Sequence, residues 1–564
     1  MSNMGESKEC QLQTDGDVEK NAKVATSTQT EYPPLKVSIP IVLCVYMVVF
    51  LCALDRTIIG VAIPAISNEF QSFADISWYE SAFLLTSCVF QLPMGKVYRY
   101  FNGKWTLVLM TTIFEVGSIV CAAAPTSNAL IVGRALGGIG LAGTTVGGQL
   151  VITKIFPLKD RPKYQGFIGA AFGIASIMGP LVGGAFTSNL TWRWCFWINV
   201  PLGGVALAGL VLILPASPPL LRLEGSFLDK VKKFDPIGNL LLIPGVVCLL
   251  LAVQWGGVVY AWSSARVIAL IVLGPVLMIA FAGTQVWLGE EATIPPRIIR
   301  QRSIAAATVA TAGFGGPLIL TSFYLPIWHQ AIKDTSAGAA GVRLLPYFLS
   351  TVFAVIASGL AVSKLGYYTP FLIIGSAISI IGSGLLTMFR VDTSKAEWVT
   401  FPFILGIGLG CILAQPQNAA QTVLSNADIP TGVSIITFAT SISGAVFVAV
   451  AQTVLSNTLV SEVSAQLPGF DASQITKTGA TDLRKGLSSQ QLPVVLRAYN
   501  KGIDNIFYLS LGLACIAFIA SFFVEWKSVR KPEDELSEQS PEEAAAEQAA
   551  KADASVKRTE RTDS

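Results

Sequence analysis

An aspartate and an arginine stand side by side in a segment otherwise suited to hydrocarbon. The apolar run "VSIPIVLCVYMVVFLCA", which starts at Val37, leads into "LDRTIIGVAIP", where the charged residues are Asp55 and Arg56. A charge at the centre of a membrane helix costs about 2.5–3.5 kcal/mol on insertion scales, so it usually faces the protein interior or water. A carboxylate balanced between burial and a nearby arginine can take up and release a proton. The alternative is an aspartate–arginine pair that only locks helices together.

A second intramembrane arginine, Arg134, lies in "GRALGGIG", among glycines that allow neighbouring helices to approach closely. An arginine in such a helix needs a carboxylate, a backbone carbonyl or a substrate as its partner. Asp55 is one candidate partner, and Glu115 in "TIFEVGSIV" is another. Asp55, Arg134 and Glu115 are therefore the predicted proton-coupling residues. For Glu115, a structural hydrogen-bonding role is the alternative.

A glycine-rich helix with a central proline is expected at residues 165–187. Its segment "GPLVGG" contains Gly179, Pro180, Gly183 and Gly184. Pro180 removes a helix hydrogen bond and bends the axis, and the glycines let a neighbouring helix pack against the bend. We predict that this helix is a gating element; an ordinary close-packed kinked helix is the alternative.

These residues belong to a chain whose composition is that of a membrane protein. Of its 564 residues, 52% are hydrophobic and 13% are charged, whereas soluble domains carry about 25% charged residues. A helix crosses the hydrocarbon with about 20 apolar residues, and fourteen segments meet that length. The chain is therefore predicted to be an all-α integral membrane protein, with spans near 38–60, 77–96, 105–124, 128–150, 165–187, 194–214, 236–255, 266–288, 304–328, 341–362, 370–389, 400–424, 432–457 and 502–524.

Lysine and arginine in the short loops predict the orientation, because they accumulate on the cytoplasmic side. With the N-terminus inside, the inner loops and the C-terminal flank hold eighteen of these residues and the outer loops hold six. Both termini are therefore expected in the cytoplasm. The net charge of +3, without a basic run interleaved with aromatics, gives no reason to expect nucleic acid as a partner.

A repeat predicts how the spans are grouped. Glycine-initiated turns, at Gly95 after the second span and at Gly359 after the tenth, suggest two homologous bundles, as is common in secondary transporters; the alternative is that any short helix hairpin uses such a turn. The predicted units are a disordered cytoplasmic tail (1–36), an N-terminal six-helix bundle (37–214), a cytoplasmic linker (215–235), two additional transmembrane helices (236–288), a C-terminal six-helix bundle (289–525) with an outer loop (458–501), and a cytoplasmic C-terminal tail (526–564).

The segments "LDRTIIGVAIPAI", "GRALGGIG", "GPLVGG" and "WRWCFWINVPLGG" resemble signature segments of the major facilitator superfamily. More narrowly, they are similar to those of the fourteen-span drug:proton antiporters, particularly fungal toxin and multidrug efflux pumps, over roughly residues 37–525. The resemblance implies the major facilitator fold, with two six-helix bundles and two extra helices between them. It also implies that Asp55 and Arg56 form the first-helix motif, that Arg134 takes part in proton transfer, and that residues 179–184 form the antiporter motif.

The loop after the second span departs from the pattern of this superfamily. An aspartate usually stands four residues after its first glycine, whereas here Gly95 is followed at that position by Arg99. Gly95, Arg99 and Lys104 are the predicted gating loop. The charge relay that the superfamily attaches to that aspartate is in question for this chain.

The resemblance further implies that the first and fourth helices of each bundle line a substrate cavity. Polar and aromatic residues in these spans suit bulky, partly apolar compounds, and hydrogen bonding between helices is the alternative for the amides. The cavity candidates are Arg56, Gln149, Tyr324, Trp328, Gln415, Gln417, Asn418 and Gln421.

The predicted function is proton-coupled efflux of small amphipathic organic compounds, such as drugs, mycotoxins or other secondary metabolites. Proton-coupled uptake, for example of a siderophore, is the alternative, and a non-transporting sensor is a further one. The chain has a single histidine and no GxxxxGK[ST] loop, so we expect no enzyme activity, no metal, no cofactor and no direct ATP drive. A monomer in the plasma membrane is expected, with the vacuolar membrane as the alternative, and Asn189 begins a glycosylation sequon.

Overall fold

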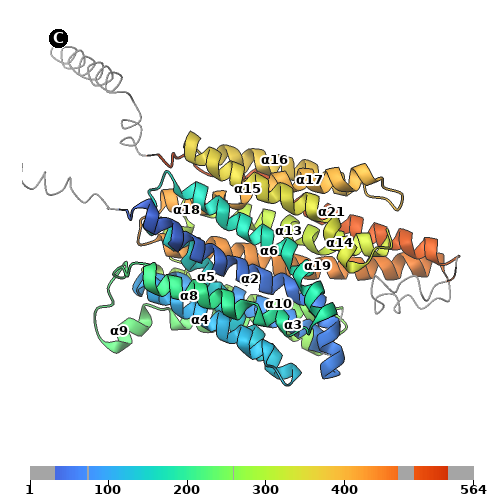
Figure 1. Cartoon of the computed structure of the whole chain (residues 1–564), viewed down its shortest axis with the longest axis horizontal. Helices are drawn as coiled ribbons and strands as arrows, with labels where there is room; N and C mark the ends of the chain where they lie inside the picture. The colour runs from blue at the N-terminus through green and yellow to red at the C-terminus, as the bar shows by residue number, and fades with distance from the viewer. Residues whose placement is uncertain (1–31, 73–74, 258–259, 468–487, 489, 531–564) are drawn as a thin grey trace, which may run out of the picture.

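The computed structural model describes residues 32–72, 75–257, 260–467, 488 and 490–530. Within these ranges the chain forms helices and no named strand (Figure 1). The helices are α2 (Leu35–Phe70), α3 (Ile76–Tyr100), α4 (Gly103–Ala122), α5 (Ser127–Ile155), α6 (Arg161–Asn189), α7 (Trp194–Trp197), α8 (Asn199–Ile213), α9 (Phe227–Lys232), α10 (Pro236–Trp255), α11 (Ala265–Leu288), η2 (Gly289–Glu291), α12 (Pro296–Ile299), α13 (Arg302–Ala331), α14 (Ala337–Arg343), α15 (Leu345–Leu365), α16 (Thr369–Leu386), α17 (Lys395–Leu413), α18 (Gln415–Val423), α19 (Ile429–Gln466) and α21 (Leu492–Ser521).

Thirteen segments of the described part are helical, long and apolar enough to cross a membrane. The second predicted span, α3, falls outside this set, because Glu80 near its start and Lys96 and Arg99 near its end lower its mean hydropathy. It nevertheless packs lengthwise against α5 and α19 and so runs through the molecule with the others. The all-helical membrane architecture is confirmed, and the predicted fourteen spans agree roughly with the thirteen helices and α3.

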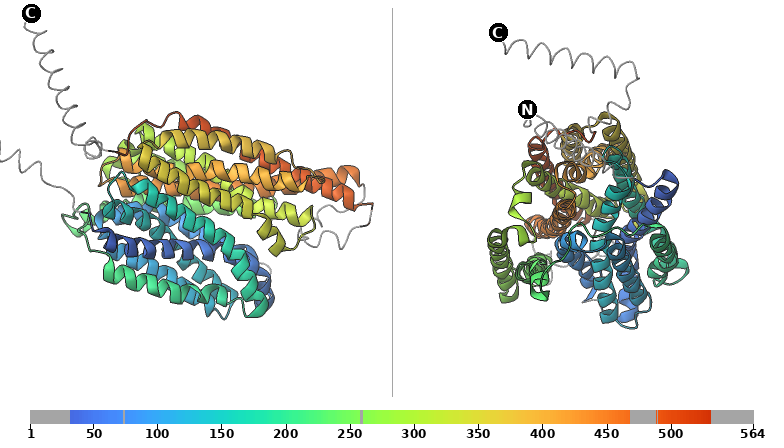
Figure 2. Two further views of the ribbon diagram at one scale, coloured as in Figure 1. Left: turned by 45° about the horizontal axis from the view of Figure 1, so that its top comes forward. Right: turned by 90° about the vertical axis from the view of Figure 1, so that its left-hand side faces the viewer.

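The helices gather into two bundles. Helices α2 to α8 pack on one another, as do α13 to α21, and we call these groups the N-terminal and C-terminal bundles. Both described chain ends lie at the same end of the molecule, here called the terminal face; the other end is the opposite face (Figures 1 and 2). Helices α3 and α19 meet across the two bundles, and so do α6 and α15.

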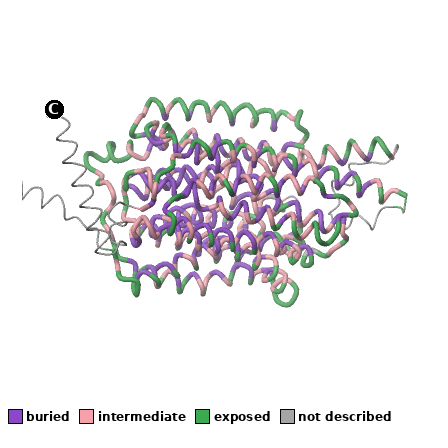
Figure 3. Tube along the Cα trace, turned by 90° about the horizontal axis from the view of Figure 1, so that it is seen from above, coloured by how far each residue is buried: buried purple, intermediate pink, exposed green. Residues whose placement is uncertain are grey.

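Helices α10 and α11 form a pair beside the bundles. α10 contacts α3 and α19, whereas α11 packs mainly on α10 and buries only four residues. Burial is concentrated in the middle of the molecule and exposed residues follow its outer helices (Figure 3). Such apolar exposed helices are expected where lipid, rather than water, surrounds the protein.

Local sequence signals explain where several helices begin and end. The Asn102 side chain accepts hydrogen bonds from the first amides of α4, and Thr126 does the same for α5. These side chains satisfy amides that have no partner within the helix. The predicted twelfth span is divided at Ala414 into α17 and α18, because Pro416 at the start of α18 cannot continue the ladder of helix hydrogen bonds.

The outer loop predicted at residues 458–501 is shorter in the structure. Residues 458–466 continue α19, and residues 492–501 are the first turns of α21. The two extensions hold each other, since Lys501 pairs with Glu462 and Gly502 packs against Leu455. Residues 468–487 of that loop lie outside the described residues, as do residues 1–31 and 531–564 of the predicted tails.

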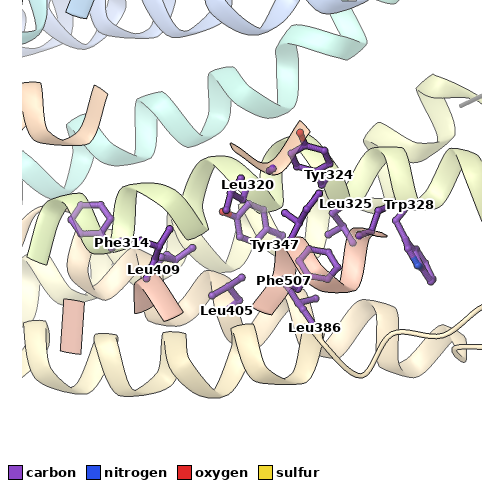
Figure 4. Packing of buried hydrophobic residues seen from close by; sticks show 14 of the residues in the cluster. Phe314, Leu320, Tyr324, Leu325, Trp328, Tyr347, Leu386, Leu405, Leu409 and Phe507 are labelled. Atoms are coloured by element: carbon purple, nitrogen blue, oxygen red, sulfur yellow. The ribbon is translucent and has the colours of Figure 1, made fainter. Parts of the chain in front are cut away.

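Each bundle has its own apolar core. The largest core lies in the C-terminal bundle, where aromatic residues of α13 and α15 interdigitate with leucines of α16 and α17 (Figure 4). A second core joins α2, α3, α4, α5 and α8 in the N-terminal bundle and also takes in Ile429 and Val433 at the start of α19. These cores make each bundle a packed unit that can carry charged residues at fixed positions.

Candidate functional site

Asp55 and Arg134 meet inside the N-terminal bundle. The Arg134 Nη1 atom donates to Asp55 Oδ2 in an ion pair between α5 and α2. Both side chains are buried, with 2% of Asp55 and 1% of Arg134 exposed. Of the two carboxylates considered for Arg134, the structure therefore brings Asp55 to it.

Three neighbouring residues hold this ion pair in place. Arg134 Nε donates to the Tyr79 carbonyl oxygen at 2.8 Å, and its guanidinium lies 4.2 Å from the centre of the Phe83 ring. Asn199 Nδ2 donates to Asp55 Oδ1 at 3.2 Å and to Ser118 Oγ at 3.1 Å. A guanidinium above an aromatic face gains further stabilisation in such a dry site.

Asn199 is a site residue that the sequence prediction missed. It is the first residue of α8 and is fully buried. The available signal was a lone amide in the apolar stretch "CFWINVPLGG", and buried polar groups of this kind usually hold a partner.

Glu115 lies on α4 near this ion pair but does not contact Arg134. Its carboxylate lies against the backbone of Gly203 on α8, where an added Cβ would come within 1.7 Å of Oε1. Both of its carboxylate oxygens are buried and have no hydrogen-bond partner among the described residues. The charges of Glu115 and Asp55 act on one another, so protonation of one carboxylate favours ionisation of the other.

The glycines of the predicted antiporter motif join α6 to α2. A Cβ on Gly179 would lie 2.1 Å from Thr57 Oγ1, and a Cβ on Gly183 would lie 2.8 Å from Ile58 Cγ1. Thr57 Oγ1 also donates to the Ala175 carbonyl oxygen at 3.3 Å. The motif therefore packs on the helix turn that directly follows Asp55. Pro180 faces the C-terminal bundle, with its Cβ 3.7 Å from the position of a Cβ on Gly341.

At the terminal face, the predicted gating loop crosses to the C-terminal bundle. A Cβ on Gly95 would lie 2.7 Å from Ser434 Oγ on α19. Arg99 Nη2 lies 3.3 Å from Asp428 Oδ1, in the segment that leads into α19. Lys104 instead stays in its own bundle and donates to the Val211 carbonyl oxygen at 2.7 Å. The arginine that replaces the usual aspartate of this loop thus has an aspartate as its partner.

Asp428 has a second arginine in its own bundle. Arg297 Nη1 donates to Asp428 Oδ2 at 3.1 Å, and Ser425 Oγ donates to the same oxygen at 2.7 Å. Burial alone would raise the pKa of Asp428, but the hydrogen bonds from Arg297 and Ser425 and the charges of Arg99 and Arg297 outweigh it. The pKa of Asp428 is therefore below its ordinary value.

A second contact between the bundles lies at the terminal face, between α15 and the start of α6. Ser363 Oγ on α15 donates to the Lys159 carbonyl oxygen, just before α6, at 2.6 Å. The backbone of Gly359 lies against that of Pro162, because a Cβ on Gly359 would come within 2.6 Å of the Pro162 carbonyl oxygen. The two bundles are thus in tight contact at the terminal face.

The amides of α18 are buried near this closed end, and they are only partly satisfied. Gln415 Nε2 donates to the Cys411 carbonyl oxygen at 3.0 Å, Asn418 Nδ2 donates to Gln415 Oε1 at 3.0 Å, and Gln417 Nε2 donates to Thr437 Oγ1 at 3.2 Å. Among the predicted cavity residues, the amide atoms that are buried without a hydrogen-bond partner in the described part of the chain are Gln149 Oε1, Gln417 Oε1, Asn418 Oδ1, and Gln421 Oε1 and Nε2. Unpaired buried polar atoms are costly, and they mark places where water or a ligand can bind.

The two aromatic cavity candidates belong to the core of the C-terminal bundle (Figure 4). Tyr324 Oη donates to the Val448 carbonyl oxygen at 3.1 Å, and Trp328 Nε1 donates to Asn500 Oδ1 at 2.9 Å. Both side chains are buried and hydrogen-bonded within their own bundle, so packing accounts for them in this conformation. Arg56 is half-buried, and Asn189 is exposed at the last residue of α6.

Comparisons with known proteins identify relatives of the whole chain. The family model of the Major Facilitator Superfamily matches residues 45–448 of the chain. The chain is 45% identical over 486 residues to the MFS-type transporter VdtG of Byssochlamys spectabilis, covering 86% of this chain and 87% of that protein. It is 43% identical to the efflux pump aflT of Aspergillus parasiticus, with 87% and 96% covered, and 42% identical to the rubrofusarin-specific efflux pump aurT of Gibberella zeae, with 90% and 92% covered.

Solved structures agree in fold. The proton:xylose symporter XylE superposes with a TM-score of 0.56 at 13% identity, and 88% of this chain and 98% of that one are covered. The human organic anion transporter MFSD10 gives a TM-score of 0.55, also at 13% identity, with 86% and 100% covered. Together with the sequence relatives, these matches show that the chain is a multi-pass membrane protein and a member of the major facilitator superfamily.

Proposed function

We propose that this protein exports small amphipathic organic compounds in exchange for protons, by alternating access of a site between its two bundles. The relatives that are named efflux pumps support export. The observation that carries the coupling to protons is the buried Asp55–Arg134 ion pair, fixed between helices of an otherwise apolar bundle. Charges are retained at such depth mainly where they serve transport or proton relay.

In this proposal, protonation of Asp55 weakens its pairing with Arg134. Arg134 would then rely on the Tyr79 carbonyl oxygen and the Phe83 ring, which it already contacts. Since Gly179 and Gly183 pack on the turn after Asp55, a shift of α2 would be transmitted to α6. Helix α6 also touches α15 of the other bundle, so the change reaches the interface that must open.

The cargo is proposed to bind near the unpaired amides of α18 and Gln149. Free carbonyl oxygens can accept hydrogen bonds from hydroxyl groups, and the free Gln421 amide nitrogen can donate one to a carbonyl. Aromatic secondary metabolites that carry hydroxyl and carbonyl groups fit that donor and acceptor pattern. Arg56, which is half-buried, is a further candidate contact.

The proposed setting is the plasma membrane, with the terminal face in the cytoplasm. The threefold excess of lysine and arginine in the loops of that face supports this orientation. A monomer driven by the proton gradient, without a cofactor or a catalysed reaction, completes the proposal.

The test is transport by purified protein in liposomes with an imposed pH gradient, using a panel of aromatic hydroxylated metabolites that includes rubrofusarin. We expect at least one compound to move against the proton flow and to stop when a protonophore removes the gradient. Movement of compounds with the proton flow would identify an uptake carrier and overturn the direction. Transport that continues at the same rate after the protonophore is added would overturn the proposed coupling to protons.

A further inference from the structure

A third intramembrane carboxylate, Glu80, lies beside the Asp55–Arg134 pair. It directly follows Tyr79 on α3, and the Tyr79 carbonyl oxygen accepts the hydrogen bond from Arg134 Nε. Unlike Asp55, Glu80 is only half-buried. Within the described ranges its carboxylate has no hydrogen bond and no ion pair, so it has no partner that fixes its protonation state.

Two arginines, on two other helices, influence Glu80 through their charges. The charges that act on it are Arg56 on α2 and Arg134 on α5. Helix α10, which also packs on α3, has no charged residue, and the only one in α19 is Glu462, which pairs with Lys501. Protonation of Glu80 would therefore change the balance of charge at Arg134, which is the partner of Asp55.

Glu80 is also close to the opposite face. Helix α3 begins there at Ile76, so at 1.5 Å per residue Glu80 lies about 6 Å along the helix from its start. Gly60, one helix turn beyond Arg56, is exposed, and a Cβ there would meet nothing within 4 Å. An exposed position on α2 thus lies one helix turn from Arg56, while the terminal face is closed.

Another acid at this end, Asp75, is held differently. Its Oδ2 atom accepts hydrogen bonds from Ser127 Oγ, at 2.6 Å, and from Ser72. These hydrogen bonds keep the pKa of Asp75 below its ordinary value. Asp75 is therefore ionised at neutral pH, whereas the carboxylate of Glu80 has no such hydrogen bonds in the described part of the chain.

We propose that Glu80 is the carboxylate that takes up protons from the opposite face and passes them to the Asp55–Arg134 pair. Hydronium gives one proton to the Glu80 carboxylate, which forms the neutral acid and water. Glu80 then returns to its ionised form when that proton moves on to Asp55, so no charge is created or lost. This inference rests on the proposed proton-coupled export, because only coupling gives the proton a path to follow.

The first experiment detects protonated carboxylic acids by chemical labelling and needs no transported compound. The full-length protein in liposomes is treated with dicyclohexylcarbodiimide, which reacts with protonated carboxylic acids in apolar surroundings, and the modified peptides are mapped by mass spectrometry. We expect modification of Glu80 at acidic pH, protection at alkaline pH, and loss of that label in Glu80→Gln. Absence of label on Glu80 at every pH, or label on Asp55 alone, would overturn the inference.

The second experiment measures transport. Glu80→Gln should reduce proton-driven transport at least tenfold and leave exchange of cargo across the membrane without a gradient unchanged, whereas Glu80→Asp should retain coupling. Glu69→Gln is the matched control, because Glu69 is an exposed acid near the same face that pairs with Arg193. Full coupling in Glu80→Gln would overturn the inference, whereas absence of coupling in the unmodified protein would overturn the proposed function.

Discussion

Two aspartate–arginine pairs of this protein differ in whether their partners belong to one bundle or to two. Asp55 and Arg134 both lie in the N-terminal bundle, so they can stay together when the bundles move as rigid bodies. Arg99 lies in the N-terminal bundle and Asp428 in the C-terminal one, so this pair must break whenever the terminal face opens. The first pair is therefore suited to respond to a proton, and the second to hold one conformation.

Their surroundings differ in the same way. The Asp55 pair is enclosed by Tyr79, Phe83 and Asn199, and nothing but protonation or helix movement can replace its contacts. Asp428 keeps Arg297 and Ser425 within its own bundle when Arg99 leaves. Opening the terminal face thus costs one ion pair without leaving a bare carboxylate, which keeps the cost small enough for a reversible step.

The largest effect is expected when the pair within one bundle is broken. Asp55→Asn leaves Arg134 buried without a counter-charge, and loss of one partner from a buried pair costs about 3–5 kcal/mol. We expect proton-driven transport in liposomes to be abolished and the thermal unfolding temperature to fall. Adding Arg134→Gln removes the orphan charge, so it should restore much of the thermal stability but not the transport. Proton-driven transport at the original rate in Asp55→Asn would contradict the assignment.

The next largest effect is expected when the packing of α6 on α2, beside the ion pair, is disturbed. Gly179→Ala would place a Cβ 2.1 Å from Thr57 Oγ1, and overpacking of this kind costs about 1–3 kcal/mol. Thermal unfolding of the purified protein should shift downward, with slower transport. Gly184→Ala is the matched control, because its Cβ would meet nothing closer than Val61 Cγ1 at 4.0 Å. Equal behaviour of the two variants would show that the close contact is not important.

A smaller effect is expected when the pair between the bundles is broken. Arg99→Gln removes the contact between the N-terminal bundle and Asp428, whereas Arg297→Gln leaves that contact and removes the pairs of Arg297 with Asp428 and Glu290. Loss of an ion pair worth about 1.4 kcal/mol favours the open terminal face roughly tenfold. A cysteine at Ser363, read by peptide mapping after treatment with an impermeant maleimide, should therefore react faster in Arg99→Gln. An equal acceleration in Arg297→Gln would contradict the distinction between the two arginines.

Asp55 was one of two carboxylates that the sequence offered as partners of Arg134, whereas the pair of Arg99 with Asp428 was not predicted, for a physical reason. Asp55 and Arg134 stand in apolar helices, where the cost of a buried charge makes each a conspicuous residue that needs a partner. Asp428 lies in the polar segment "SNADIP", where a charge costs little and carries no signal. Its contact with Arg99 depends on how the two bundles dock, and composition does not encode that docking.

The same reasoning applies to individual candidates. The amides of α18 were recognisable because they interrupt an apolar segment, and the structure places them in buried positions with unpaired atoms. Tyr324 and Trp328 carried the same signal, yet they face the core of their own bundle. The side of a helix on which a residue lies decides between these outcomes, and that side is set by packing with helices far away in the sequence.

The smallest effect is expected from a change of pH. We expect mild acidification to leave the pair between the bundles intact. Because the pKa of Asp428 is depressed, its contribution is present above the ordinary aspartate pKa of about 3.9 and is lost only as the pH falls through the lower folded value. The ratio of Ser363 cysteine labelling between Arg99→Gln and the parent protein should therefore be the same at neutral and mildly acidic pH. A ratio that falls towards one on mild acidification would mean that Asp428 is protonated there. The pair between the bundles would then sense the proton directly, and the division of roles between the two pairs would fail.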